Sequence, residues 1–323
     1  MYYAGIDIGG TKCAAVLGKR SGDGITLLSK EQFATGGPPN SMLERLAASL
    51  ERQIEAQQLP KKGLACIGIS CGGPLSSKTG MILSPPNLPG WDQVKAADFF
   101  IARFGVKAVL QNDANACAVA EWKFGAGRGL QNVIFLTFGT GLGAGLILDG
   151  RLYCGTDDMA GELGHIRLAP DGPVGYGKPG SMEGFCSGGG IAALGRSMAE
   201  QERAREGCSP LLEAAGGPEQ ITAKLIAELA DAGDSLCREI YRQSGEQLGK
   251  GLSILVDLLN PEMIIIGSVF ARSHHLLWEP CSQVMERECL PVSLRSCRVV
   301  PSRLGDALGD IAALAIAAAS GEE

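Results

Sequence analysis

The 323-residue sequence lacks the features of a membrane-bound or secreted protein. No apolar stretch approaches the roughly 18 residues that a bilayer-spanning helix needs. The first residues run directly into an apolar, strand-like segment, with no charged region followed by an apolar core that would mark a signal peptide. We therefore expect a cytoplasmic protein without a membrane partner.

Basic clusters are also absent. The net charge is −6 with a pI near 5.3, and no basic patch is interleaved with aromatic residues. This balance disfavours nucleic acid and anionic membranes as partners. The eleven cysteines are odd in number, irregularly spaced and without a C-x-x-C pair, so we expect reduced thiols rather than a disulfide framework. Cys66, Cys71 and Cys117 lie in apolar runs and are expected in the core.

Glycine is abundant, with 46 residues, and the first of two glycine-rich turns lies near the start of the chain. It separates residues 2–6 from residues 13–17, whose alternating apolar pattern predicts a β-hairpin. The turn itself contains Gly9, Gly10, Thr11 and Lys12. Glycines tolerate positive φ and leave backbone N–H groups open to phosphate oxygens, while the hydroxyl and the ammonium add further donors. An ordinary tight hairpin with a solvated lysine is the alternative interpretation.

Asp7 precedes this turn, and its negative charge would need a partner other than the phosphate oxygens. Beside phosphates, a lone carboxylate is best explained as a direct or water-mediated partner of Mg²⁺. The spacing G-x-x-x-x-G-K-[ST] is absent, so the turn is not a Walker A loop.

The second glycine-rich turn follows the apolar run at residues 133–138 and contains Gly139, Thr140 and Gly141. With Ala144, its glycines match the dinucleotide-binding pattern G-x-G-x-x-A, which requires a helix directly afterwards. Here an apolar run leads into Asp149-Gly150, a hairpin turn pair, so we expect a strand instead. A second phosphate-binding turn between two strands fits better.

Asn112 and Asp113 lie between an expected strand at residues 106–110 and an expected helix at residues 116–124. Open α/β sheets bind their ligands at this end of a strand. The functional interpretation is a general base, Asp113, beside a hydrogen-bonding amide. On these residues alone, the favoured interpretation is that Asp113 simply caps the helix.

A third polar set contains Glu162, His165 and Glu183, all in glycine-flanked segments. The E-x-x-H spacing occurs in di-iron bundles, but these need a second copy and more carboxylates. A lone histidine is also common in a protein core. Two carboxylates and an imidazole nevertheless form a plausible set for binding a polyhydroxyl compound, since carboxylates accept hydrogen bonds from hydroxyls.

Taken together and in order, the motifs resemble the ROK group of bacterial sugar kinases and sugar-responsive repressors, within the actin, hexokinase and Hsp70 ATPase superfamily. The resemblance covers nearly the whole chain. The matching segments are residues 7–12, 72–74, 86–91, 112–116, 139–145, 160–165, Glu183, Ser187-Gly188 and 264–267.

The resemblance implies an α/β, actin-like (ribonuclease H-like) fold with two α/β domains and an ATP and sugar cleft between them. We expect an N-terminal domain at residues 1–113 and a C-terminal domain at residues 114–323. The terminal helix, residues 304–319, is expected to pack back on the N-terminal domain.

The resemblance also implies an ATP-dependent sugar kinase that uses Mg²⁺ and forms a homodimer. Asp113 would be the catalytic base. The sugar would be held by Gly73, Asn87, Asn112, Asp113, Glu162, His165 and Glu183. The nucleotide would be held by Asp7, Gly9, Gly10, Thr11, Lys12, Gly139, Thr140, Gly141 and Gly267, the last near the adenosine.

Two departures from the family pattern stand out. Relatives carry C-x-C-G-x-x-G-C before the position of Glu183, which with the histidine forms a structural zinc site; here Val174, Tyr176 and Ser181 replace the three cysteines. We therefore expect no zinc, and His165 would need another orienting contact, such as a hydrogen bond from Tyr176. At residues 267–270, the further glycine that is usual in the family's kinases is missing, which bears on adenosine affinity and nucleotide choice.

Two alternatives belong to other functional classes. A sugar-responsive repressor carries a DNA-binding segment before the first strand; with that strand expected at about residue 2 and an acidic balance, we do not expect one. A sugar-binding protein without kinase activity is opposed by the presence of Asp113 and both glycine turns. The sequence leaves the sugar open between a glucose-type hexose and an N-acetylhexosamine.

Overall fold

The computed structural model describes residues 1–60 and 63–321 and divides the chain into two compact units. The first unit contains residues 1–135, 145–160 and 303–323, and the second contains residues 136–144 and 161–302. Strands β8 (Val133–Phe138) and β9 (Leu142–Leu148) carry the chain from one unit to the other and back. The expected domain boundary after residue 113 stays a prediction.

The remaining elements fall within one unit each. Those of the first unit are β1 (Tyr2–Ile8), β2 (Lys12–Ser21), β3 (Gly24–Ala34), α1 (Pro39–Ala56), β4 (Leu64–Cys71), β5 (Leu75–Ser76), β6 (Met81–Ile82), α2 (Ala96–Phe104), β7 (Lys107–Asn112), α3 (Asp113–Phe124), β10 (Arg151–Tyr153) and α12 (Leu308–Ser320). Those of the second are β11 (Val174–Gly175), β12 (Lys178–Pro179), α4 (Met182–Phe185), α5 (Gly188–Glu206), α6 (Pro210–Ala215), α7 (Ala223–Asp231), α8 (Ser235–Leu259), β13 (Met263–Ile266), α9 (Val269–Arg272), α10 (His274–Glu288), α11 (Pro291–Ser296) and β14 (Arg298–Pro301). Short 3₁₀ turns occupy Leu163–His165, Pro218–Gln220 and Gly305–Ala307.

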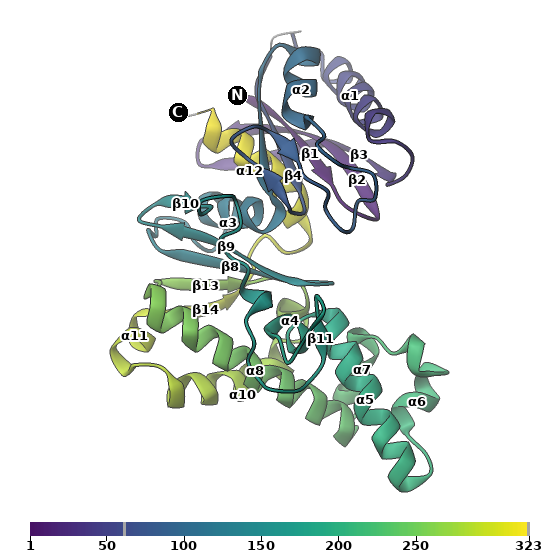
Figure 1. Ribbon diagram of the computed structural model, residues 1–323. Helices are drawn as coiled ribbons and strands as arrows, with labels where there is room; N and C mark the ends of the chain where they lie inside the picture. Colours follow the sequence, from purple (N-terminus) through teal and green to yellow (C-terminus); the bar gives the residue numbers. More distant parts are fainter. Residues whose placement is uncertain (61–62, 322–323) are drawn as a thin grey trace. The chain divides into compact units, whose positions relative to one another are not determined.

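A five-stranded sheet in the order β3-β2-β1-β4-β7 forms the centre of the first unit. β1, β2 and β3 pair antiparallel, whereas β1, β4 and β7 pair parallel. Alternate residues of β1 point to opposite faces. Ala4, Ile6 and Ile8 join the core beneath α1 and α2, while Tyr3 joins the core beneath α12 on the other face (Figure 1). By the same alternation, Asp7 lies on the α12 face.

Glycines let α12 lie directly on this sheet. A Cβ at Gly5 of β1 would come within 2.9 Å of the Ala313 Cβ, and one at Gly18 of β2 within 2.6 Å of a Leu314 methyl carbon. A Cβ at Gly68 of β4, which pairs with Gly5, would overlap the Ala313 carbonyl oxygen. At these glycines the alanine-rich helix therefore packs against strand backbone, while elsewhere it packs against the side chains of Tyr3, Val16 and Cys66.

The second sheet has the order β10-β9-β8-β13-β14. Between β9 and β10, Asp149 and Gly150 both have positive φ, at 50° and 69°, as in the type I′ turns that join tight hairpins. The second glycine turn is thus followed by strand β9, as predicted, and not by the helix that the dinucleotide-binding pattern requires. In the second unit, α8 packs along α10 and also contacts α5 and α7.

Several local expectations can be compared with the structure. Apolar residues at helical spacing over residues 41–56, with Ser41 and Glu44 as a possible capping box, predict a helix; in the structure this helix begins earlier, at Pro39. Its N-cap is Pro38, with no side-chain hydrogen bond, so a capping box there was a wrong expectation. Cys66 and Cys71 are buried, Cys117 is half-buried, and all eleven cysteines are free thiols. Across residues 1–60 and 63–321, none of the helices has the length and apolar character needed to cross a membrane.

Candidate active site

The first glycine turn joins β1 to β2 as predicted, with Ile8 paired to Cys13. Neither Gly9 nor Gly10 adopts a left-handed backbone, so the expected need for positive φ is not what selects glycine here. Space is the reason: a Cβ at Gly9 would lie 2.8 Å from the Lys12 carbonyl oxygen, and the Gly9 carbonyl accepts a 2.6 Å hydrogen bond from the Thr35 hydroxyl. The turn is tight, and Gly10 remains exposed.

Asp7 lies at the end of β1, between Ala14 of β2 and Ser70 of β4. Burial and then the charges of Asp113 and Asp310 raise the pKa of its carboxyl to about 6, against a hydrogen bond from Ser70 that lowers it. Asp310, in the first turn of α12, is itself ion-paired with Lys30 at 2.7 Å. The face of the sheet next to the first turn therefore collects carboxylates, a setting that favours a cation.

Asn112 and Asp113 occupy the junction of β7 and α3, as predicted. Asn112 is the N-cap: its Oδ1 accepts hydrogen bonds from the N–H groups of Ala114, at 2.9 Å, and Asn115, at 3.4 Å. Asp113 is the first helical residue, and its Oδ1 also accepts from Ala114, at 2.8 Å. Asp113 is exposed when the accessible surface of the whole residue is considered, yet desolvation by surrounding protein raises the pKa of its carboxyl.

The loop that contains Asn87 lies against the first glycine turn. A Cβ at Gly10 would come within 2.6 Å of the Asn87 carbonyl oxygen, and one at Gly72 would lie 3.5 Å from the Asn87 amide nitrogen. A Cβ at Gly73 would lie 3.5 Å from the Nδ2 of Asn112. Four of the predicted residues of this unit, Gly10, Asn87, Gly73 and Asn112, are thus linked by close contacts, with Gly72 between them, because glycines allow the backbones to approach.

The second glycine turn lies in the second unit, against the start of α5. The Gly188 N–H donates to the Gly139 carbonyl at 2.7 Å, and a Cβ at Gly189 would lie 3.3 Å from the Thr140 carbonyl oxygen. Ser187 caps α5 by accepting from Gly190 at 2.9 Å. A turn of open backbone beside the N-terminus of a 19-residue helix is suited to an anion.

Gly267 follows β13, and its N–H donates to the Leu136 carbonyl of β8 at 3.0 Å. The next residue, Ser268, has φ 52° and ψ −113°, a backbone conformation that only glycine adopts easily. Its hydroxyl oxygen lies 3.9 Å from where a Cβ of Gly139 would stand. Gly267 and the second glycine turn are therefore close to each other.

Glu183 connects the second glycine turn to the segment of His165. Its Oε2 accepts a 3.0 Å hydrogen bond from the Leu142 N–H, next to Gly141. Its Cβ lies 3.2 Å from where a Cβ of Gly164 would stand. Glu162 occupies the N-cap position of the 3₁₀ turn that ends at His165, without a capping hydrogen bond from its side chain, and both side chains are exposed.

The segment between His165 and Glu183 forms a two-stranded hairpin, β11 and β12. Val174 and Tyr176, which replace two cysteines of the family pattern, are exposed. Ser181, which replaces the third, is buried and caps α4 through the Gly184 N–H at 3.2 Å. Tyr176 contacts His165 through its ring, in an edge-to-face arrangement, and not through the hydrogen bond that we expected.

Within the part of the chain that the structure describes, no three His, Cys, Asp or Glu side chains gather in a way that could hold a metal ion. In the described segment next to His165, the metal-binding cysteines of the family pattern are replaced by Val174, Tyr176 and Ser181, so this segment offers no cluster of thiolates to a metal ion.

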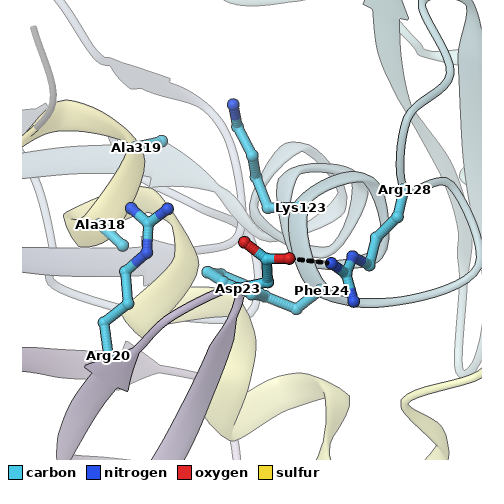
Figure 2. Close-up of a pocket in the computed structure, with 7 residues that line it drawn as sticks. All are labelled: Arg20, Asp23, Lys123, Phe124, Arg128, Ala318 and Ala319. Atoms are coloured by element: carbon cyan, nitrogen blue, oxygen red, sulfur yellow. Dashed lines mark hydrogen bonds and ion pairs between the residues drawn. The ribbon is translucent and has the colours of Figure 1, made fainter.

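A small cavity of about 150 Å³ lies away from all the predicted site residues (Figure 2). Arg20, Lys123 and Arg128 surround it, together with Asp23, which is ion-paired to Arg128 at 3.1 Å. The cavity lies at the carboxyl-terminal ends of α3 and α12, where cations are favoured by the helix dipole. These charges therefore have a structural explanation.

Two functional features had only weak sequence signals. The start of α5, Ser187 followed by three glycines, matches the family pattern at Ser187-Gly188, but only the structure shows its contact with Gly139. Asp310 lies in a helix that looked purely structural, and only the packing of α12 on the sheet brings its charge near Asp7.

Comparisons with known proteins agree with this geometry. Residues 3–320 match the ROK family. The glucokinase of Streptomyces coelicolor is 32% identical over 317 residues, covering 97% of this chain and 96% of that protein. The xylose repressor of Caldicellulosiruptor bescii is 28% identical over 306 residues, covering 94% of this chain and 74% of that protein.

Among solved structures, a ROK family glucokinase from Streptomyces griseus in complex with glucose and AMPPNP is 30% identical, with a TM-score of 0.78. The similarity covers 99% of this chain and 100% of that chain. Because both kinds of match span nearly the whole sequence, this protein belongs to the ROK family and has the actin-like α/β fold expected from its motifs.

Proposed function

We propose that this ROK family member is an ATP-dependent sugar kinase that phosphorylates a hydroxyl of a hexose, either glucose-type or an N-acetylhexosamine. One observation carries most of the weight. Asp113 stands at the end of a parallel strand as the first residue of α3, with a raised pKa, while Asn112 caps that helix. The likeness to glucokinases over nearly the full chain supports the same conclusion.

Asp113 acts as the general base. As a sugar hydroxyl attacks the γ-phosphorus of ATP, its proton passes to the Asp113 carboxylate, and the bond between the γ-phosphorus and the β,γ-bridging oxygen breaks. A raised pKa makes the carboxylate a better proton acceptor than an ordinary aspartate. General-base help of this kind is typically worth ~10²–10⁴-fold in rate.

The two glycine turns and the start of α5 hold the ATP phosphates. Backbone N–H groups at Gly10 and Gly141, with Thr11, Lys12 and Thr140, would supply the donors, and Gly267 would lie on the adenosine side. The N–H groups of Gly9 and Gly139 donate inside the turns, at 3.1 Å, to the Lys12 and Gly141 carbonyls, so these two glycines would contribute close approach rather than donors. Asp7 would hold Mg²⁺, directly or through water. Its half-buried carboxylate, with Asp113 and Asp310 acting on it, has the oxygen chemistry that Mg²⁺ prefers. The ion would supply charge neutralisation on the phosphates.

The sugar is held by carboxylates and amides. Glu162 and the second oxygen of Glu183 accept hydrogen bonds from hydroxyls, while His165 and the Nδ2 of Asn112 donate. Asn112 is suited to this because its Oδ1 is already used by the helix, which leaves the amide N–H₂ as the donor. Asn87 and Gly73 complete the set.

The alternative is a sugar-binding regulatory protein of the same family without kinase activity. The similarity to a xylose repressor supports this alternative. The presence of both glycine turns in addition to Asp113 supports the kinase, since a protein that only binds sugar needs no phosphate-binding turns. The expected homodimer also stays a prediction, which light scattering would test.

A coupled assay tests the function directly. The purified protein is given ATP and Mg²⁺ with glucose, mannose, fructose, allose, N-acetylglucosamine or N-acetylmannosamine, and ADP release is followed. We expect turnover with at least one aldohexose and loss of that turnover in Asp113→Ala. Sugar binding by calorimetry without ADP release from any sugar would overturn the kinase in favour of the regulator.

A further inference from the structure

Tyr176 occupies an unusual position in the β11–β12 hairpin. Val174 pairs with Pro179 and Gly175 with Lys178, so Tyr176 and Gly177 are the two central residues of the turn. Their φ angles are 46° and 74°. Positive φ at both central residues is typical of a type I′ turn, whose first position strongly prefers asparagine, aspartate or glycine.

A tyrosine at this position strains the backbone. A bulky residue in the left-handed region is an outlier that costs on the order of 1–3 kcal/mol, and such strain tends to occur where it serves a function. The side chain gains no compensating burial, because Tyr176 is 70% exposed. The folded hairpin would therefore be more stable with asparagine at this position.

The hairpin does not need Tyr176 to keep its shape. The Ser181 hydroxyl donates to the Gly175 carbonyl at 3.3 Å, and Arg167 donates to the Pro179 carbonyl at 2.9 Å. The Gly180 N–H donates to the Pro173 carbonyl at 3.1 Å. These bonds fasten both strands to the surrounding chain.

What Tyr176 does contact is His165. The two rings meet edge to face, with centroids 5.8 Å apart and planes 66° apart. Two residues along, the Lys178 ammonium donates a 2.7 Å hydrogen bond to the His165 carbonyl. One short hairpin thus holds both the ring and the backbone of an exposed histidine on a single 3₁₀ turn.

We propose that Tyr176 and Lys178 are positioning residues that hold the His165 imidazole ready to bind a sugar hydroxyl. This inference rests on the proposed function, in which His165 contacts the sugar. An unsupported exposed imidazole loses rotational freedom when it binds a ligand, whereas a ring already held by Tyr176 has lost it beforehand. Ordering one such side chain typically costs a factor of about two to ten in affinity.

Two substitutions of Tyr176 separate positioning from fold stability. Tyr176→Asn relieves the turn strain, so we expect a higher melting temperature together with a two- to tenfold rise in the KM and Kd for the sugar. The kcat and the KM for ATP should change little. Tyr176→Phe keeps the ring contact and should behave as wild type, and Lys178→Met should repeat the KM effect without the gain in stability.

Imidazole NMR gives a readout that does not depend on activity. The chain has only three histidines, so the His165 ring signals can be assigned with a His165→Gln variant. Removing the ring in Tyr176→Asn should shift the His165 signals and leave those of His274 and His275 unchanged, while Tyr176→Phe keeps them close to wild type.

The double variant distinguishes a failure of the positioning role from a failure of the proposed function. If Tyr176 acts through His165, Tyr176→Asn should have no further effect on sugar affinity in a His165→Ala background. A His165→Ala protein with unchanged sugar affinity would refute the role of His165 in the proposed function. Weakened binding in His165→Ala but unchanged binding in both Tyr176→Asn and Lys178→Met would overturn the positioning role alone.

Discussion

Asn112 caps the helix that Asp113 begins. The Asn112 Oδ1 accepts the N–H groups of Ala114, at 2.9 Å, and Asn115, at 3.4 Å, and the Asp113 Oδ1 shares the Ala114 N–H at 2.8 Å. Capping was the simpler explanation of Asp113 in the sequence. Because Asn112 is the N-cap, the presence of a carboxylate at the next position is better explained by chemistry.

Replacing Asp113 should separate chemistry from binding. In Asp113→Ala we expect kcat to fall ~10²–10⁴-fold, because the sugar hydroxyl loses its base. The Kd for sugar, measured by calorimetry, should stay within about tenfold, or ~1.4 kcal/mol. Near-normal turnover in this variant would remove Asp113 from the mechanism.

Asn112 carries two roles that two substitutions can distinguish. Asn112→Ala loses both the cap and the amide donor, so the free energy of unfolding in urea should fall by about 1 kcal/mol and the sugar KM should rise. Asn112→Ser keeps a capping oxygen and should restore most of the stability while the KM stays high. Equal KM values in Asn112→Ser and wild type would argue against a sugar contact.

Asp7 should make the folded protein less stable at neutral pH than in mild acid. Its pKa is raised from 3.8 to about 6, so between these values the folded state keeps a proton that the unfolded state has lost. The contribution of Asp7 to the unfolding free energy therefore falls as pH rises through this window, by up to about 3 kcal/mol, and is constant above it.

Asp7→Asn tests this linkage. Urea unfolding at pH 4 and pH 7.5 should show the variant gaining stability over wild type only at the higher pH, while ATP turnover with Mg²⁺ is impaired. An equal difference at the two pH values would show that the folded-state pKa of Asp7 is not raised.

Ser268 holds a backbone conformation suited to glycine, with φ 52° and ψ −113°. Ser268→Gly should release backbone strain of about 1–3 kcal/mol. The greater freedom of glycine in the unfolded chain opposes this gain by roughly 1 kcal/mol. We expect a net gain in urea-unfolding stability. Asn260→Gly is the matched control: Asn260 lies in the ordinary left-handed region, with φ 43° and ψ 55°, so its replacement should change stability little.

The close packing of α12 on the first sheet predicts that alanine substitutions at two glycines change the stability of the protein in opposite directions. Gly68→Ala would drive a methyl group into the Ala313 carbonyl and should destabilise the protein by at least 1–3 kcal/mol. Gly309→Ala, on α12 itself, meets no atom within 4 Å and should stabilise the helix by up to about 1 kcal/mol. Thermal unfolding of the two variants measures both; a tolerated Gly68→Ala would contradict the close packing.

Local patterns predicted the features that depend on neighbouring residues. The alternation on either side of Gly9 and Gly10 predicted a hairpin, and Asp149-Gly150 predicted a tight turn; both were confirmed, because strand period and turn chemistry act over a few residues. The start of α1 was missed, since the helix begins at Pro39, a favourable first helical residue, and its N-cap Pro38 has no side-chain acceptor that would mark the start.

Contacts between segments that lie far apart in the sequence could not be predicted from local patterns. The ring of Tyr176 against His165 and the bond from Leu142 to Glu183 depend on where loops meet, which residue type alone does not specify. The same holds for the charge of Asp310 beside Asp7, which required α12 to lie on the glycines of the sheet.

The sequence by itself determined the two glycine turns, the strand end that presents Asp113, and the family to which the chain belongs. These follow from residue order, because local backbone preferences and motif spacing depend only on which residues occur and how far apart they are in the sequence. Only the tertiary structure decided that Asp310 acts on Asp7, that α5 begins beside Gly139, and that Tyr176 lies on His165. Each of these is a contact whose partners are chosen by the packing of whole elements.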